Sequence, residues 1–378
     1  TGKGVPFPVR LFYTTSTPKG WNVMIVLLSF VLYLLGMILA AVGSRLAGRC
    51  ATWCFALCGF PMWVVGATGA SLCIALPQLM LAFLASGLSI TALAVGTALA
   101  GAVTDVGLVL AVCLVRKDVT VDRGEMIRKC LILVTACVVL LLFVRDGLLS
   151  YTGVGLLMGL FVLFVMENIV YQHHTVYEEE MDLITVQDHP DLKNFSARDD
   201  GTVRFPAMNV KNSLRNLAGV LCGGGVLVLG AYALLYASVV FANLTGTIQA
   251  LWAATLLSLG FCLPLLAEAF HHPFGSAWKR FAERCRIYPA WTFSMQVLNA
   301  AILNITLVLP LASLMYRKRL PVGEQFRTYE VPACIVMSLL LLLPALFKRK
   351  LYRWQGTACL TVYLCYLAAV LFAPLAGA

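Results

Sequence analysis

The residues Leu131-Ile-Leu-Val-Thr-Ala-Cys-Val-Val-Leu-Leu-Leu-Phe-Val144 form a continuous apolar stretch without a charged side chain. A strand of a membrane β-barrel alternates polar and apolar residues over about 10 positions, so this stretch does not fit a barrel strand. Helices are the other structure that satisfies every backbone polar group inside a lipid bilayer. The stretch therefore predicts a transmembrane helix.

Similar apolar segments occur along the whole chain of 378 residues, which is 60% hydrophobic and 12% charged. Soluble domains carry roughly 25% charged residues, whereas a helix of about 20 apolar residues crosses the hydrocarbon core of a bilayer. We therefore expect one all-α integral membrane domain with about ten transmembrane helices. The ten segments are Trp21 to Val42, Ala51 to Met80, Leu88 to Val115, Met126 to Val144, Leu148 to Val170, Ser213 to Phe241, Thr247 to Phe270, Ile287 to Tyr316, Val331 to Phe347 and Trp354 to Ala373.

The basic residues between these segments predict the topology. If the N-terminus lies outside, 20 of the 28 Lys and Arg residues fall in inward loops and 8 in outward segments. Inward loops of membrane proteins are enriched in Lys and Arg. Both termini are therefore expected outside, and the basic residues mark topology rather than a nucleic-acid partner.

A polar stretch, residues 171–212, separates the fifth segment from the sixth and is expected inside. We interpret residues 1–20 as an outward N-terminal segment, 21–170 and 213–378 as two five-helix repeats, and 171–212 as an acidic inward loop. Five helices per repeat is an odd number, so two related repeats must be inverted in the membrane, which is a transporter architecture. The loop's acidic residues are Glu178, Glu179, Glu180, Asp182, Asp188, Asp191, Asp199 and Asp200.

Short motifs recur in the two halves. Ala75-Leu-Pro-Gln78 in the second segment corresponds to Cys262-Leu-Pro-Leu265 in the seventh. Ala94-Val-Gly-Thr-Ala-Leu-Ala-Gly-Ala-Val-Thr-Asp105 in the third corresponds to Phe293-Ser-Met-Gln-Val-Leu-Asn-Ala-Ala-Ile-Leu-Asn304 in the eighth. In helix order and in these motifs the chain resembles the cation/calcium exchanger family, the sodium/calcium antiporters and their relatives.

The resemblance implies an ion site in which this chain has lost ligands. The family carries a Gly-Thr-Ser-Leu-Pro-Glu type motif in the second and seventh helices, where proline breaks the helix and glutamate supplies carboxylate oxygens. Pro77 and Pro264 keep the helix-breaking positions, but Gln78 and Leu265 replace the two glutamates. Calcium takes six to eight oxygen ligands, so we expect a degenerate site. The resemblance places this site at Gln78, Thr97, Asp105, Leu265, Glu268, Gln296, Asn299 and Asn304.

Asp105 is the strongest functional candidate, because an ionisable residue inside an apolar helix is costly and is by default a functional hypothesis. The alternative is a structural acid, held neutral or hydrogen-bonded to a neighbouring helix. Glu268 lies near a helix end and could reach water. Gln296 and Asn304 fit interhelical hydrogen bonds as well as ion ligation.

Other clusters suggest no further chemistry. The 13 cysteines include no Cys-x-x-Cys pair, and Cys50, Cys54 and Cys58 on one helix face have no nearby histidine or acid in the sequence. His173-His174 and His271-His272 fit solvated or partner-contacting segments, since adjacent side chains point to different sides. We expect no metal site from these clusters, no cofactor, no enzymatic activity and no nucleic-acid partner.

Two functions remain open. The one we favour from sequence is a structural or accessory subunit of a larger membrane complex, with an exchanger fold that has lost calcium exchange. The alternative is an active cation antiporter, sodium/calcium or proton-coupled, with an altered site. Membrane lipids and protein partners are expected, with sodium, calcium or protons if transport is retained. Thr1 in place of Met suggests a removed leader; a mitochondrial inner membrane is favoured, with plasma membrane or plastid open.

Overall fold

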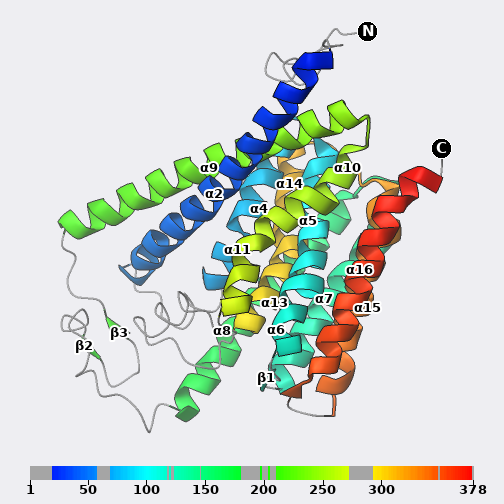
Figure 1. The fold of residues 1–378 in the computed structure, drawn as a ribbon. Coiled ribbons are helices and arrows are strands. Elements are labelled where there is room, and N and C mark those ends of the chain that lie inside the picture. Colours follow the sequence, from blue (N-terminus) through cyan, green and yellow to red (C-terminus); the bar gives the residue numbers. More distant parts are fainter. Residues whose placement is uncertain are drawn as a thin grey trace.

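The computed structural model describes residues 19–57, 69–116, 119–120, 123–144, 146–179, 196–197, 203–204, 210–271, 293–347 and 350–376. Nearly all of these residues are helical (Figure 1). In this part of the chain nine helices are long and apolar enough to span a membrane, and the shorter apolar helix Ser71–Gly87 is a tenth candidate. The prediction of an all-α membrane protein with about ten transmembrane helices is confirmed.

Ten helical rods follow one another along the described chain, several of them interrupted by a wider π-helical turn, labelled η. The first five are α2 (Lys19–Leu57), α4 (Ala70–Gly87), α5 (Thr91–Thr104) continued by η3 (Asp105–Leu110) and α6 (Ala111–Arg116), α7 (Arg123–Phe143) and α8 (Tyr151–Glu179). The second five are α9 (Val210–Thr245), α10 (Gln249–Trp252) with η6 (Ala253–Leu257) and α11 (Ser258–His271), α13 (Phe293–Leu303) with η7 (Asn304–Val308) and α14 (Leu309–Tyr316), η8 (Phe326–Glu330) with α15 (Val331–Ala345), and α16 (Arg353–Ala376).

Three helices have ends that differ from the predicted apolar segments. The loop expected between Val42 and Ala51 does not exist, because α2 continues through Arg45 and Arg49 to Leu57. No proline interrupts this region, and arginine is a good helix former. The helix α8 likewise extends to Glu179, inside the loop expected at 171–212. The ninth rod begins at Phe326 rather than Val331, which brings Glu330 into the bundle.

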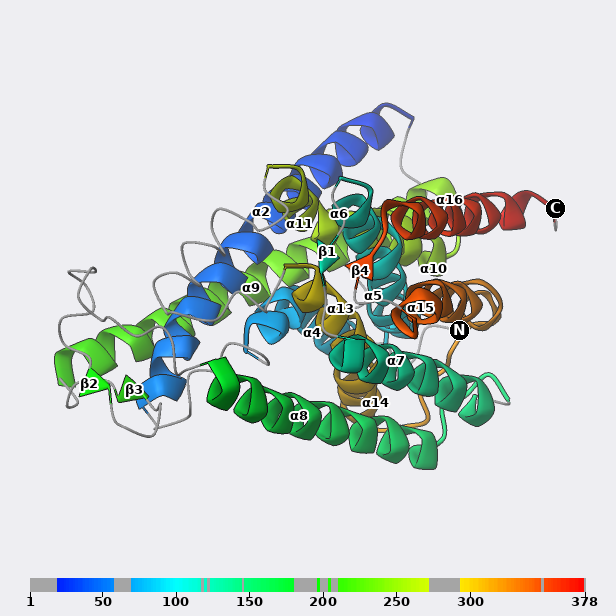
Figure 2. The ribbon, with the colours of Figure 1, turned by 90° about the horizontal axis from the view of Figure 1, so that it is seen from below.

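The two long helices α2 and α9 pack side by side and cross the outside of the bundle (Figures 1 and 2). Glycines allow their backbones to touch: a Cβ added at Gly43 would lie 2.5 Å from Leu227 N, and one at Gly223 would lie 2.5 Å from Ala47 N. Small residues at such crossings are how transmembrane helices gain packing energy where lipid offers no hydrophobic driving force. The pair is therefore held together by close backbone contact.

Short antiparallel contacts join the loops of the two halves in an inverted arrangement. The strand β1 (Val119–Thr120), which follows the third rod, pairs with β4 (Lys350–Leu351), which precedes the tenth. The equivalent contact with the two halves exchanged joins Pro321, which follows the eighth rod, to Leu148, which precedes the fifth. Next to it, Leu149 N donates to Leu320 O over 2.9 Å. A third pair, β2 (Ser196–Ala197) with β3 (Val203–Arg204), lies within the segment between the halves. The first two pairs are the contacts expected of inverted repeats.

The start of α2 and the end of α16 lie at the same end of the bundle, and the end of α8 lies at the opposite end (Figure 1). This arrangement agrees with the topology predicted from the basic residues. Which end faces inward stays a prediction, as does the division of the chain into four segments at residues 20, 170 and 212.

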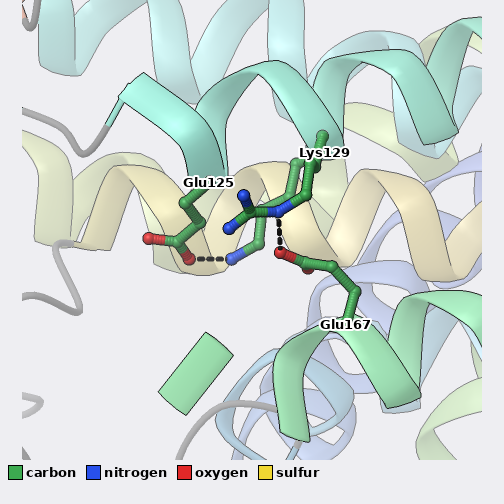
Figure 3. A network of polar contacts seen from close by, with 4 residues as sticks. Glu125, Lys129 and Glu167 are labelled. Carbon is green, nitrogen blue, oxygen red and sulfur yellow. Dashed lines mark hydrogen bonds and ion pairs between the residues drawn. The ribbon is translucent and has the colours of Figure 1, made fainter. Parts of the chain in front are cut away.

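A buried ion pair lies near the start of α7. Lys129 donates to Glu125 one turn earlier, and Arg128 donates to Glu167 Oε1 of α8 over 2.8 Å (Figure 3). The predicted fourth segment begins at Met126, whereas α7 begins three residues earlier, at Arg123. A lysine can be buried here because its charge is paired.

Glu125→Gln is expected to lower the free energy of unfolding by about 3–5 kcal/mol, because it leaves the Lys129 ammonium buried without its carboxylate. The double variant Glu125→Gln, Lys129→Met is expected to recover most of this loss. Unfolding in mixed detergent micelles measures both. A single variant as stable as the wild-type protein would contradict the pairing.

Candidate functional site

The centre of the bundle is formed by two rods with the same spacing of functional positions. Thr97, Gly101 and Asp105 recur every four residues on the third rod and lie on one helical face. Gln296, Ala300 and Asn304 recur in the same way on the eighth, each 199 residues after its counterpart. All six positions are buried. The two repeats therefore present equivalent faces in the core.

A π-helical turn begins at the last position of each face. In the third rod η3 starts at Asp105, and in the eighth η7 starts at Asn304. Wide turns of this kind disrupt the regular i→i+4 bonding and are frequent at functional sites. Pro310, which has no N–H to donate, follows η7 as the second residue of α14. The helical backbone is thus irregular at Asp105 and at Asn304.

Asp105 connects both halves of the chain. Asn304 Nδ2 donates to Asp105 Oδ2 over 2.9 Å, and Cys262 Sγ donates to Asp105 Oδ1 over 3.3 Å. The Gln78 side-chain amide lies beside this carboxyl. One carboxyl therefore holds together the second, third, seventh and eighth rods, and we call Gln78, Asp105, Cys262 and Asn304 the central cluster.

Gly101 provides the space for this cluster. A Cβ added there would lie 3.1 Å from Gln78 Nε2 and 3.3 Å from Asn304 Nδ2. A side chain at this position would thus push against both amides that contact Asp105. The absence of a side chain at Gly101 lets Gln78 and Asn304 approach the carboxyl from opposite repeats.

Four amide oxygens of predicted site residues are buried and have no hydrogen-bond partner in the part of the chain that the structure describes. Two belong to the central cluster, Gln78 Oε1 and Asn304 Oδ1. The other two, Gln296 Oε1 and Asn299 Oδ1, lie on α13 before Asn304. A buried acceptor without a donor costs about 1–3 kcal/mol. Oxygen acceptors with unused lone pairs beside a carboxylate are the chemistry that binds a cation.

The other predicted positions are less suited to ligation. The Thr97 hydroxyl donates to Leu93 O of its own helix over 2.7 Å. Leu265 is buried and apolar, and Pro77 and Pro264 lie inside α4 and α11 next to the residues of the central cluster. Glu268 belongs to α11, but its side chain lies outside the described part. The same holds for the side chains of His173, His174 and His271, and for all of His272.

Sequence reasoning missed two residues. Cys262 was named only as the first residue of the motif Cys262-Leu-Pro-Leu265, although its thiol is the group that reaches Asp105 from the seventh rod. Glu330 was not singled out, because the predicted ninth segment begins one residue later, at Val331. The wide turn η8 precedes α15, so the helix starts earlier. An acid two residues before a proline and next to a long apolar run was the available signal.

Comparisons with known proteins agree on the fold. Residues 294–372 match the family described as sodium/calcium exchanger protein. The structure is similar to that of the sodium-calcium exchanger NCX_Mj at 20% identity, with 92% of this chain and 98% of that chain covered and a TM-score of 0.53. It is also similar to the H⁺/Ca²⁺ exchanger CAX at 14% identity, with 97% and 91% covered and a TM-score of 0.58. No match was found among curated proteins.

Proposed function

Since the chain has the fold of the cation/calcium exchangers and its last three rods match the sodium/calcium exchanger family, we propose that it is a membrane carrier whose central cluster binds a proton or a monovalent cation instead of calcium. The observation that carries this proposal is Asp105, a buried carboxyl that both repeats surround with amide groups.

The number of carboxyl groups in the central cluster favours a monovalent over a divalent ion. The central cluster contains one carboxyl, and the two positions where the family has glutamate hold Gln78 and Leu265. A divalent cation bound there would keep an excess positive charge in a low-dielectric interior, which costs several kcal/mol. A proton or a monovalent cation on Asp105 leaves the site neutral. The site therefore balances one positive charge.

Oxygen ligands distinguish a binding site from a purely structural acid. Asn304 donates a hydrogen bond to Asp105, and the amide oxygens of both Asn304 and Gln78 are unused within the described residues. A structural hydrogen-bond network is expected to satisfy its members, whereas a cation site needs acceptors that are free in the empty state. The unused oxygens beside Asp105 favour binding.

A second candidate is the accessory subunit favoured from sequence. It is supported by the two hydrogen bonds that Asp105 accepts from Asn304 and Cys262, which hold the carboxyl without any ion. In this function the exchanger fold is a structural subunit that binds protein partners in a larger membrane complex. The mitochondrial inner membrane is the favoured location.

The test is ligand-dependent stability of the purified protein in detergent. Sodium, against an equal concentration of choline, is expected to raise the melting temperature of the wild-type protein, since a ligand at 100 times its dissociation constant contributes about 2.7 kcal/mol. Asp105→Asn is expected to abolish this response. Ser338→Ala, which removes a buried hydroxyl bonded to Cys334 O on α15, is the control and is expected to respond like the wild-type protein.

The outcomes separate the candidates. A response to pH but not to sodium, lost in Asp105→Asn, identifies the proton as the bound ion. Identical melting of the wild-type protein and Asp105→Asn at every pH and in both salts would reject the carrier and favour the accessory subunit. Co-purification of stoichiometric partners from native membranes would then identify the assembly.

A further inference from the structure

A second buried acid lies apart from the central cluster. Glu330, the last residue of η8, is completely buried. Gln325 Nε2 donates to its Oε1 over 3.2 Å, and the Tyr366 hydroxyl of α16 donates to the same oxygen over 3.3 Å. The other oxygen, Oε2, has no hydrogen-bond partner within the described residues. One half of this carboxyl is thus available for a proton.

No basic side chain on the neighbouring helices compensates a charge on Glu330. The helices that pack against η8 are α5, α15 and α16. Neither α5 nor α15 contains a Lys, Arg, Asp or Glu. The one charged residue of α16 is Arg353, the first residue of that helix. It lies about three and a half helical turns from Tyr366, the residue of α16 that contacts Glu330. Arg327, on the same turn as Glu330, is exposed. The titratable groups that these elements contribute are Tyr329, Cys334, Cys359, Tyr363, Cys365 and Tyr366.

Two tyrosines of α16, Tyr366 and Tyr363, lie on the side of Glu330 that faces η3. The rings of Tyr366 and Tyr363, one turn apart on α16, have centroids 5.9 Å apart. Tyr363 packs against η3, where a Cβ added at Gly107 would lie 2.9 Å from Tyr363 Cβ. Its hydroxyl is buried close to Thr104, the residue before Asp105, and has no hydrogen-bond partner of good geometry in the described part. The tyrosine pair therefore lies between Glu330, which Tyr366 contacts, and η3, the turn that begins at Asp105 and that Tyr363 contacts.

Glu330 also lies near one surface of the protein. Gln325, its other hydrogen-bond partner, is half-buried, and the preceding Gly323 and Glu324 are exposed. These residues belong to the connection between α14 and η8, at one end of the bundle. A proton could thus reach Glu330 from water past the Gln325 side chain.

We propose that Glu330 binds a proton at this end of the bundle and exchanges it with Asp105 through Tyr366 and Tyr363. This inference rests on the proposed carrier function, because it assigns a proton route to the same central cluster.

The transfer moves one proton and no electrons. The O–H bond of the Glu330 carboxyl breaks and an O–H bond on the Asp105 carboxylate forms, so Glu330 becomes negative and Asp105 neutral. Each tyrosine hydroxyl on the way accepts one proton and gives up its own, and ends unchanged. The Tyr363 hydroxyl, which has no hydrogen-bond partner among the described residues, must turn to form hydrogen bonds with Tyr366 and Asp105 during the transfer. The carboxylate left on Glu330 keeps the hydrogen bonds from Gln325 and Tyr366, which stabilise its charge. It recovers a proton from water.

Infrared difference spectra between acidic and neutral pH test the proton site directly, without any transport. The wild-type protein in detergent is expected to show a protonated-carboxyl band that Glu330→Gln removes. Glu324→Gln, which changes an exposed acid six residues earlier, is the matched control and is expected to keep the band. Identical spectra of Glu330→Gln and the wild-type protein would overturn the proposal.

Coupling to Asp105 is tested in the same spectra. Asp105→Asn is expected to shift the titration midpoint of the Glu330 band by at least half a pH unit, and Tyr363→Phe is expected to leave the band but slow its appearance after a pH jump at least threefold. Unchanged midpoint and rate in both variants would reject the route, leaving an isolated acid.

Proton movement in liposomes separates this proposal from the carrier function. With an imposed sodium gradient, Glu330→Gln is expected to reduce proton flux at least tenfold while the sodium-dependent rise in melting temperature stays as in the wild-type protein. Loss of that sodium response in Glu330→Gln would reject a relay and make Glu330 part of the sodium site. If the wild-type protein moves no protons, the carrier function fails, and the spectra alone decide whether Glu330 and Asp105 exchange a proton.

Discussion

Liposomes that contain the purified protein are expected to take up no more calcium under an imposed sodium gradient than liposomes without protein. Exchange needs one site that binds calcium and sodium alternately, and calcium gives up its water only for several closely placed oxygens with carboxylate charge. Gln78 offers an amide oxygen without charge, and Leu265 offers none. Uptake of radioactive calcium measures the effect.

The double variant Gln78→Glu, Leu265→Glu is the counterpart of this experiment. It adds two carboxylates around Asp105 at the positions where the exchanger family has them, and is expected to bind calcium measurably in detergent. Strong calcium flux in the unmodified protein, lost in Asp105→Asn, would contradict the prediction and make Asp105 a sufficient calcium ligand. Calcium binding by the double variant alone would support it.

Gly223→Ala is expected to lower the free energy of unfolding by about 3 kcal/mol or to prevent folding, because its Cβ would lie 2.5 Å from Ala47 N and 3.0 Å from Ala47 Cα. These neighbours are backbone atoms of α2, so no side-chain rotation relieves the overlap. Resistance to detergent unfolding measures the change. Gly43→Ala, on the facing helix, is expected to have a similar effect.

Gly224→Ala is the matched control, since it alters the adjacent residue of the same helix where a Cβ meets nothing within 4 Å. It is expected to be neutral or to stabilise by up to about 1 kcal/mol, because alanine is the better helix former. Equal stability of the Gly223 and Gly224 variants would show that α2 and α9 do not depend on close backbone contact.

Much of the fold follows from local patterns in the sequence. Continuous apolar stretches such as 131–144 predict spanning helices because lipid leaves few other structures possible. The corresponding positions of Asp105 and Asn304 were visible as similar motifs in the two halves. Their meeting in space is a consequence of inverted repeats, which bring equivalent helices together at the centre.

Contacts between distant helices were not visible in the sequence. The bond from Cys262 to Asp105 joins residues 157 apart, and no periodicity marks a cysteine as a hydrogen-bond donor. The continuous α2 was missed because Arg45 and Arg49 suggested a loop, although a long tilted helix can carry arginines beyond its apolar part. Glu330 was missed because the predicted ninth segment begins at Val331, whereas η8 starts this rod earlier.

The separation between Asp105 and Asn304 also has a consequence for synthesis of the chain. The two residues are 199 positions apart, and ribosomes add about 5–20 residues per second, so Asp105 waits roughly 10–40 s for this partner. During that time the third rod holds an acid in or near the membrane without the eighth rod. The first half alone therefore lacks part of the environment that makes Asp105 tolerable. Its insertion is expected to be completed late, when the second half arrives.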